Sequence, residues 1–208
     1  GAEGRISGQY KIALLEMAKK DIAAGAYSEA EEKLEKALVY PENLGEGKLE
    51  GTKDNNLYYY LGLVKEALGK EGAEECFHLA ELGDNEPAGA MYYYDQPADM
   101  ILYKGLAKQK LGKTKEAHAC FNKLMDYGER HLNDVVKNDF FAVSLPDFLI
   151  FEDDMDKRNK AHCYYLMGLA NLGMGQKEKA VEEFDKALQY DFNHQNCRIY
   201  KELAKGEL

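Results

Sequence analysis

The sequence predicts an all-α protein in which helical hairpins stack side by side as a solenoid. Proline is scarce, with four in 208 residues, while Ala, Leu, Lys and Glu, which favour helix, are plentiful. Apolar residues make up 45% of the chain, enough to form a core. One spacing of glycine, small and aromatic residues also recurs along the chain, which is typical of repeat architectures.

Two glycines seven positions apart mark the first helix of each predicted hairpin. Seven residues are about two helical turns, so both glycines lie on related faces of that helix. We expect the first glycine to allow close approach of a second helix, and the second glycine to end the first helix. The pairs are Gly62 with Gly69, Gly105 with Gly112, and Gly168 with Gly175.

The second helix of each hairpin carries a small residue, an aromatic residue four positions later and an apolar residue three positions after that. This spacing predicts one apolar stripe on a helix. The three stripes are Ala73, Phe77 and Ala80; Ala117, Phe121 and Leu124; and Ala180, Phe184 and Ala187. A fourth copy at the start has Ala18 in place of the first glycine and continues with Gly25, Tyr27, Ala30, Leu34 and Ala37.

These repeats predict a single domain over residues 1–208 with four helix pairs and a capping helix whose outer face is polar. The first glycines lie further apart than a bare repeat of about 34 residues needs, so inserts are expected. The predicted pairs are 10–40, 57–82, 98–126 and 160–190, and the cap is 195–204. The inserts are expected near 41–56, 83–97 and 127–158, where Pro146 should break a helix.

The repeated frame resembles the tetratricopeptide repeat, most closely at Gly168, Gly175, Ala180, Phe184 and Asp191. A closer resemblance is carried by the stretches 40–49, 90–107, 139–154 and 158–170. Together these stretches resemble the C-terminal repeat region of large bacterial proteins in which a β-sandwich domain of unknown function precedes the repeats. The resemblance implies a C-terminal fragment whose natural neighbour is its own N-terminal domain, and it supplies no catalytic residues.

In tetratricopeptide proteins the first helix of each repeat lines a concave groove, and the resemblance carries that role onto three positions per repeat. Leucine stands where some of these domains use asparagine to grip a peptide carboxylate, so that clamp is missing here. The implied partner-binding residues are Tyr59, Leu63, Glu66, Leu102, Leu106, Gln109, Tyr165, Leu169 and Leu172, with His162 facing the same groove. In the first copy the matching positions are Leu15, Lys19 and Ile22.

This apolar groove could be filled in more than one way. The first occupant is the chain's own insert 139–151, which is too apolar to stay in water. If it fills the groove, Phe148 and Phe151 should pack against Leu106 and Leu169. The other occupant is a helix or extended segment of a protein partner or of the chain's own N-terminal domain. A small molecule is the third and weakest alternative.

No motif predicts catalysis, a metal or a cofactor. Residues 40–49 lack the first glycine and the final Ser or Thr of a phosphate loop. The acidic run 152–156 lacks the glycine and glutamate of a calcium loop. His162 and Cys163 point about 100° apart on a helix, so they make no chelating pair, and a Cys–His dyad lacks a third orienting group. We therefore predict a non-catalytic protein-interaction scaffold.

The net charge and the cysteine content limit which partners and which cellular location are expected. The net charge of −10 and the lack of a basic block disfavour nucleic acid and anionic membrane surfaces. No apolar run is long enough to span a membrane, the start resembles no secretory signal, and four dispersed cysteines predict reduced thiols in the cytoplasm. The rival prediction is an accessory module of a carbohydrate-processing enzyme, with weak glycan contact through Tyr59, Tyr93, Glu66 or His162.

Overall fold

The computed structural model describes residues 2–43, 54–90, 97–135 and 146–206. Among these residues nine α-helices and no strand are found, which confirms the predicted all-α class of helical hairpins. The helices are α1 (Ala2–Ala23), α2 (Tyr27–Asn43), α3 (Asn55–Leu68), α4 (Ala73–Ala80), α5 (Ala98–Lys110), α6 (Thr114–His131), α7 (Pro146–Gly173), α8 (Lys177–Tyr190) and α9 (Gln195–Lys205).

The first helix of every hairpin ends in the same way. At the end of α3, Gly69 has a φ of 66°, and its N–H donates to the carbonyl of Glu66. The N–H of Lys70 then reaches back to the carbonyl of Lys65 at 2.9 Å. This pattern satisfies carbonyls that a helix end leaves open, and it needs a left-handed residue. Equivalent glycines with positive φ end the other first helices: Gly25, Gly112 and Gly175.

The predicted apolar stripes of the second helices are buried except at Ala73, which is half-buried. Phe121 and Phe184 have no solvent exposure, and Phe77 has 3%. Large rings against small residues fill the space between two helices at close packing. The small and aliphatic members of these stripes without exposure are Ala30, Leu34, Ala37, Ala80, Ala117, Leu124, Ala180 and Ala187.

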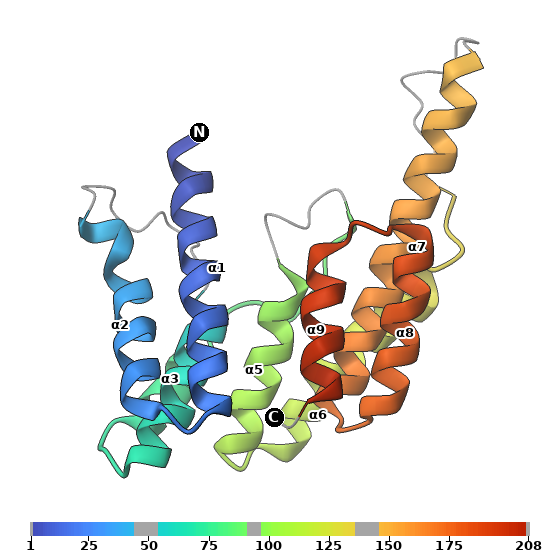
Figure 1. Ribbon diagram of the computed structural model, residues 1–208. Helices are drawn as coiled ribbons and strands as arrows, with labels where there is room; N and C mark the ends of the chain where they lie inside the picture. The colour runs from blue at the N-terminus through green and yellow to red at the C-terminus, as the bar shows by residue number, and fades with distance from the viewer. Residues whose placement is uncertain (1, 44–53, 91–96, 136–145, 207–208) are drawn as a thin grey trace. The chain divides into compact units, whose positions relative to one another are not determined.

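The chain divides into two compact units, and each is described by itself. Unit 1 contains residues 1–84 and 103–117. Within it, α1 packs on α2, α2 packs on α3, and α3 packs on α4. Figure 1 shows α1 and α2 as neighbouring antiparallel rods joined by a tight turn. The second half of α5 also belongs to unit 1, where Ala107 joins Phe77 and Ala80 in one apolar cluster.

Unit 2 contains residues 85–102 and 118–208. Here α7 packs on α8, and α9 packs on both α7 and α8. The core of α7 is nearly continuous, because every residue from Tyr165 to Gly173 is buried. A helix that is buried all round lies between other elements and leaves no wide solvent face.

The helices extend beyond their predicted bounds. α1 begins at Ala2, α6 continues to His131 and α7 begins at Pro146, so the 127–158 insert is partly helical. Pro146, expected to break a helix, instead starts one. The missing N–H has no consequence at the first helical position, and the fixed φ of proline suits it.

None of the helices in the described ranges has the length and apolar character needed to cross a bilayer.

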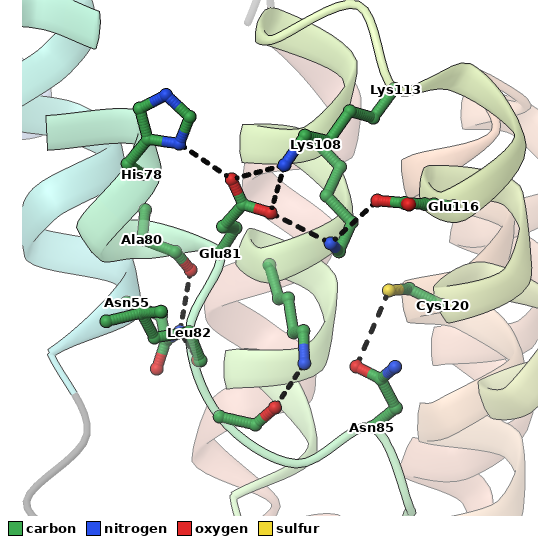
Figure 2. A network of polar contacts seen from close by, with 12 residues as sticks. Asn55, His78, Ala80, Glu81, Leu82, Asn85, Lys108, Lys113, Glu116 and Cys120 are labelled. Carbon is green, nitrogen blue, oxygen red and sulfur yellow. Dashed lines mark hydrogen bonds and ion pairs between the residues drawn. The ribbon is translucent and has the colours of Figure 1, made fainter. Parts of the chain in front are cut away.

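A carboxylate with a side chain only 10% exposed, that of Glu81, fixes the start of the loop after α4 in unit 1 (Figure 2). Glu81 accepts hydrogen bonds from Lys108 at 2.9 Å and from Lys113 at 2.9 and 3.0 Å, and it pairs with His78 at 3.0 Å. Burial raises the pKa of Glu81, but the hydrogen bonds from Lys113, Lys108 and His78 outweigh it and lower the pKa to about 2. Asn55 donates to the carbonyl of Ala80 at 2.6 Å and closes the end of α4.

Candidate functional site

In unit 1, the predicted partner-binding residues of α3 lie on one face of that helix. Tyr59, Leu63 and Glu66 follow the four-and-three spacing that aligns side chains along a helix. Tyr59 and Leu63 are half-buried and pack against the cluster of Phe77, Ala80 and Ala107. Glu66 is exposed. The face therefore offers two partly accessible apolar side chains followed by a carboxylate.

The next first helix, α5, supplies a second row. Leu106 is half-buried and Gln109 is exposed, one turn apart. Beside them, the Nζ of Lys110 lies 2.6 Å from a carboxylate oxygen of Glu66, which ties α5 to α3. The same ammonium lies 5.6 Å from the centre of the Phe77 ring. An exposed pair of this kind adds little stability, but it places charges of both signs beside the apolar residues.

The α1 positions that match this row are also partly accessible. Leu15 is buried, whereas Lys19 and Ile22 are half-buried. The Nζ of Lys19 lies 5.4 Å from the centre of the Tyr60 ring and 2.9 Å from Glu16. We define the α3–α5 face as Tyr59, Leu63, Glu66, Leu106, Gln109 and Lys110, all of unit 1.

Burial keeps the hydroxyls of Tyr59 and Tyr60 protonated at ordinary pH, because it raises the pKa of both. Burial is the main reason that the pKa of Tyr59 is raised, with Tyr103 and Glu66 adding to it. Tyr60 is fully inside, and its hydroxyl lies 3.0 Å from that of Tyr103. The rings of Tyr59 and Tyr103 are 5.7 Å apart. This aromatic base gives the accessible part of Tyr59 a fixed position.

In unit 2, the predicted partner-binding residues are buried. Leu102, Tyr165 and Leu169 have no exposure, and His162 has 4%. Tyr165 contacts α9, since its ring lies 6.2 Å from that of Tyr200 and its hydroxyl accepts a hydrogen bond from Asn196 at 3.4 Å. These four side chains are core residues in this conformation, and a partner-binding role for them stays a prediction.

The occupant expected for the groove falls outside the described residues. Nothing is described of residues 136–145, or of the side chains of residues 146–153, so the predicted contacts of Phe148 and Phe151 are not tested. What the structure places against Tyr165 is α9, the helix predicted to be only a terminal cap. Its outer face is polar, with Lys201 2.6 Å from Asp185.

His162 is buried in unit 2 and hydrogen-bonded to the backbone. Its Nε2 lies 2.8 Å from the carbonyl oxygen of Ala88, to which it donates, and its ring meets that of Tyr127 edge to face. Burial lowers the pKa of His162 to about 4, although the bond to Ala88 opposes this. The imidazole is therefore neutral near pH 7, and it secures the residues before α5.

The four cysteines are free and buried. Burial is the main cause that raises the pKa of Cys163, to about 12, and it also raises the pKa of Cys76 and Cys197. A thiol that stays protonated is a poor nucleophile and a poor metal ligand. Within the described ranges, no three His, Cys, Asp or Glu side chains lie together so that they could hold one metal ion.

Of the residues expected to touch a glycan, Tyr93 lies outside the described residues and His162 is buried. Tyr59 and Glu66 remain accessible, and both belong to the α3–α5 face. Sequence reasoning missed Lys110 and Phe77 as neighbours of that face. No local signal pairs Lys110 with Glu66, because the contact joins two hairpins.

The chain was compared with protein families and with solved structures. No family model matches the chain. A solved structure titled "MamA RS-1 ArsTM double mutant" is similar over 94% of this chain and 83% of its own, with 16% sequence identity and a TM-score of 0.32. At that TM-score the likeness supports no conclusion about function.

Proposed function

We propose that this chain is a non-catalytic protein-interaction module that holds a segment of a protein partner, or of its own N-terminal domain, on the α3–α5 face. The observation that carries the proposal is the pairing of two rows of side chains on neighbouring first helices. Tyr59 and Leu63 lie on α3, and Leu106 lies on α5, each partly accessible. Apolar side chains spaced along a helix suit a bound helix or extended segment.

The polar residues of the same face support a protein ligand. Glu66, Gln109 and Lys110 supply a carboxylate, an amide and an ammonium beside the leucines. An apolar centre with a polar rim is the usual composition of a protein interface. The Cys163 thiol stays protonated and is a poor nucleophile, which supports a role in binding over one in catalysis.

The test is co-purification of this chain with the separately expressed N-terminal domain of its parent protein, followed by titration calorimetry. Leu63→Glu and Leu106→Glu should each weaken binding at least tenfold, because a carboxylate would lose hydration in the interface. Leu79→Glu is the matched control, since Leu79 is 44% exposed and lies on α4 outside the α3–α5 face. Equal affinity of all three variants, or no binding of the wild-type chain, would refute the proposal for this partner.

A further inference from the structure

Helix α9 begins with an unusual cap. Its capping residue is His194, whose Nδ1 accepts a hydrogen bond from the backbone N–H of Cys197 at 3.1 Å. Ser, Thr, Asp and Asn are the ordinary residues at this position, because their oxygens accept at every pH above about 4. An imidazole nitrogen accepts only while it carries no proton. The start of α9 therefore depends on a neutral histidine.

Helix α9 packs into the core of unit 2. Its buried residues are Cys197, Tyr200 and Ala204, which lie along one face of the helix. Tyr200 donates a hydrogen bond to Asp99 at 2.8 Å, and the ring of His194 lies 4.8 Å from that of Tyr165. The cap is one of the local contacts that hold the N-terminus of α9 against this core.

The groups around His194 set its response to acid. Burial lowers the pKa of His194, and Asp191 in the preceding turn opposes this. From α7, the imidazole of His162 also faces it, and each would repel a charge on the other. From α9 itself, Arg198 donates to the carbonyl of Phe192 and lies over the Phe192 ring. Asp191 thus favours a proton on His194, whereas burial and the repulsion between the two histidines disfavour it.

We propose that His194 is a proton-sensitive latch for α9. A proton taken up at Nδ1 turns the acceptor into a donor, so the hydrogen bond from the Cys197 N–H is lost. The new positive charge then lies at the N-terminus of α9, where the helix dipole is already positive. Both effects favour detachment of α9, which uncovers Tyr165 on α7. The latch concerns α9 alone and does not depend on the proposed function.

The direction with pH follows from linkage. Since the folded state disfavours the protonated imidazole, the detached state binds more protons as the pH falls below about 6.5. The neutral cap contributes fully above that pH and is lost progressively below it. Loss of a cap is worth about 1 kcal/mol, which is roughly a fivefold change in the opening equilibrium.

Hydrogen exchange measured by mass spectrometry on the full chain tests the latch at pH 7.5 and pH 5.5, with rates corrected for intrinsic exchange. Peptides from α9 should lose protection about fivefold at the lower pH, while peptides from α8 keep theirs. His194→Asn keeps an acceptor that does not titrate, so its α9 should show no pH response. His162→Gln is the matched control and should keep the response of the wild type.

Two results would overturn the proposal. One is an α9 response that persists in His194→Asn or disappears in His162→Gln, since either would place the titrating group elsewhere. The other is loss of protection in α8 and α9 together, which would indicate global unfolding. An NMR titration of the His194 ring gives an independent check: a pKa at or above 6.5 in the wild-type chain would exclude a latch of this kind.

Discussion

Phe77 of α4 lies so close to Gly62 of α3 that a Cβ atom at position 62 would fall 2.6 Å from ring carbon Cε1. The last hairpin has the same relationship, with Phe184 2.4 Å from a Cβ placed on Gly168. In each of these hairpins the ring therefore packs where the glycine has no side chain. Phe121 meets Gly173 in the same way at 2.4 Å, a contact between α6 and α7 that the repeat pattern did not indicate.

Gly62→Ala should destabilise the chain by about 1–3 kcal/mol, because the added methyl overpacks the contact with the Phe77 ring. The midpoint of urea unfolding measures the loss. Gly8→Ala is the control, since a Cβ at Gly8 meets nothing within 4 Å and alanine favours helix by up to about 1 kcal/mol. Adding Phe77→Leu to Gly62→Ala should recover part of the loss. An unchanged midpoint for Gly62→Ala would contradict the packing account.

Glu81→Gln should cost about 1–3 kcal/mol at pH 7, because Lys108 and Lys113 would lose the negative charge of a mostly buried partner. Since the folded pKa of Glu81 is lowered to about 2, its contribution is complete above about pH 4.5 and is lost as the pH falls toward 2. Urea midpoints measured from pH 7 to pH 2.5 should therefore converge for wild type and Glu81→Gln.

The control for Glu81 is Glu116→Gln, because Glu116 also pairs with Lys108 but its side chain is 61% exposed. Its loss should stay below about 1 kcal/mol. If both variants lost the same stability, the network would act only through surface charge.

Tyr60→Phe and Tyr103→Phe should each cost about 1–3 kcal/mol, since each leaves a buried hydroxyl without the partner 3.0 Å away. The double variant should lose less than the sum, because removing both hydroxyls leaves fewer unpaired groups. A double-mutant cycle from thermal or urea unfolding gives the coupling. Strict additivity would show that the two hydroxyls do not interact.

The four thiols should resist an aromatic disulfide reagent in the folded chain and react at once in denaturant. For Cys163, a pKa of about 12 lowers the thiolate fraction at pH 8 by about 10³-fold against a free cysteine. Absorbance at the released-thiolate wavelength counts the reactive groups with and without 6 M guanidinium. A thiol that reacts fast without denaturant would indicate local opening of its helix.

Local rules were enough for much of the fold. The spacing of Gly62 and Gly69 predicted both a close crossing and a helix end, and the structure places Phe77 at the first and a left-handed turn at the second. Such features depend on residues a few turns apart, where helical geometry relates sequence to position. Pro146 shows the limit, because the same residue suits either a break or a start.

Helical spacing predicted only part of the candidate site. The positions of Tyr59, Leu63 and Glu66 on one face follow from helical spacing, but their partners on α5 do not. The pairing of Glu66 with Lys110 joins residues 44 apart, and the bond from Tyr200 to Asp99 joins residues 101 apart. No sequence period relates such residues, so nothing local indicated that α9 would cover Tyr165.

The sequence by itself determined that this chain is helical, where its first helices end and which side chains form the stripes of the second helices. These properties are settled within one or two turns, by backbone hydrogen bonds and by the conformational freedom of glycine. The tertiary structure decided which of the predicted partner-binding residues stay accessible, because burial depends on which distant helix lies over each face. It left the α3–α5 face partly open and covered Tyr165 with α9.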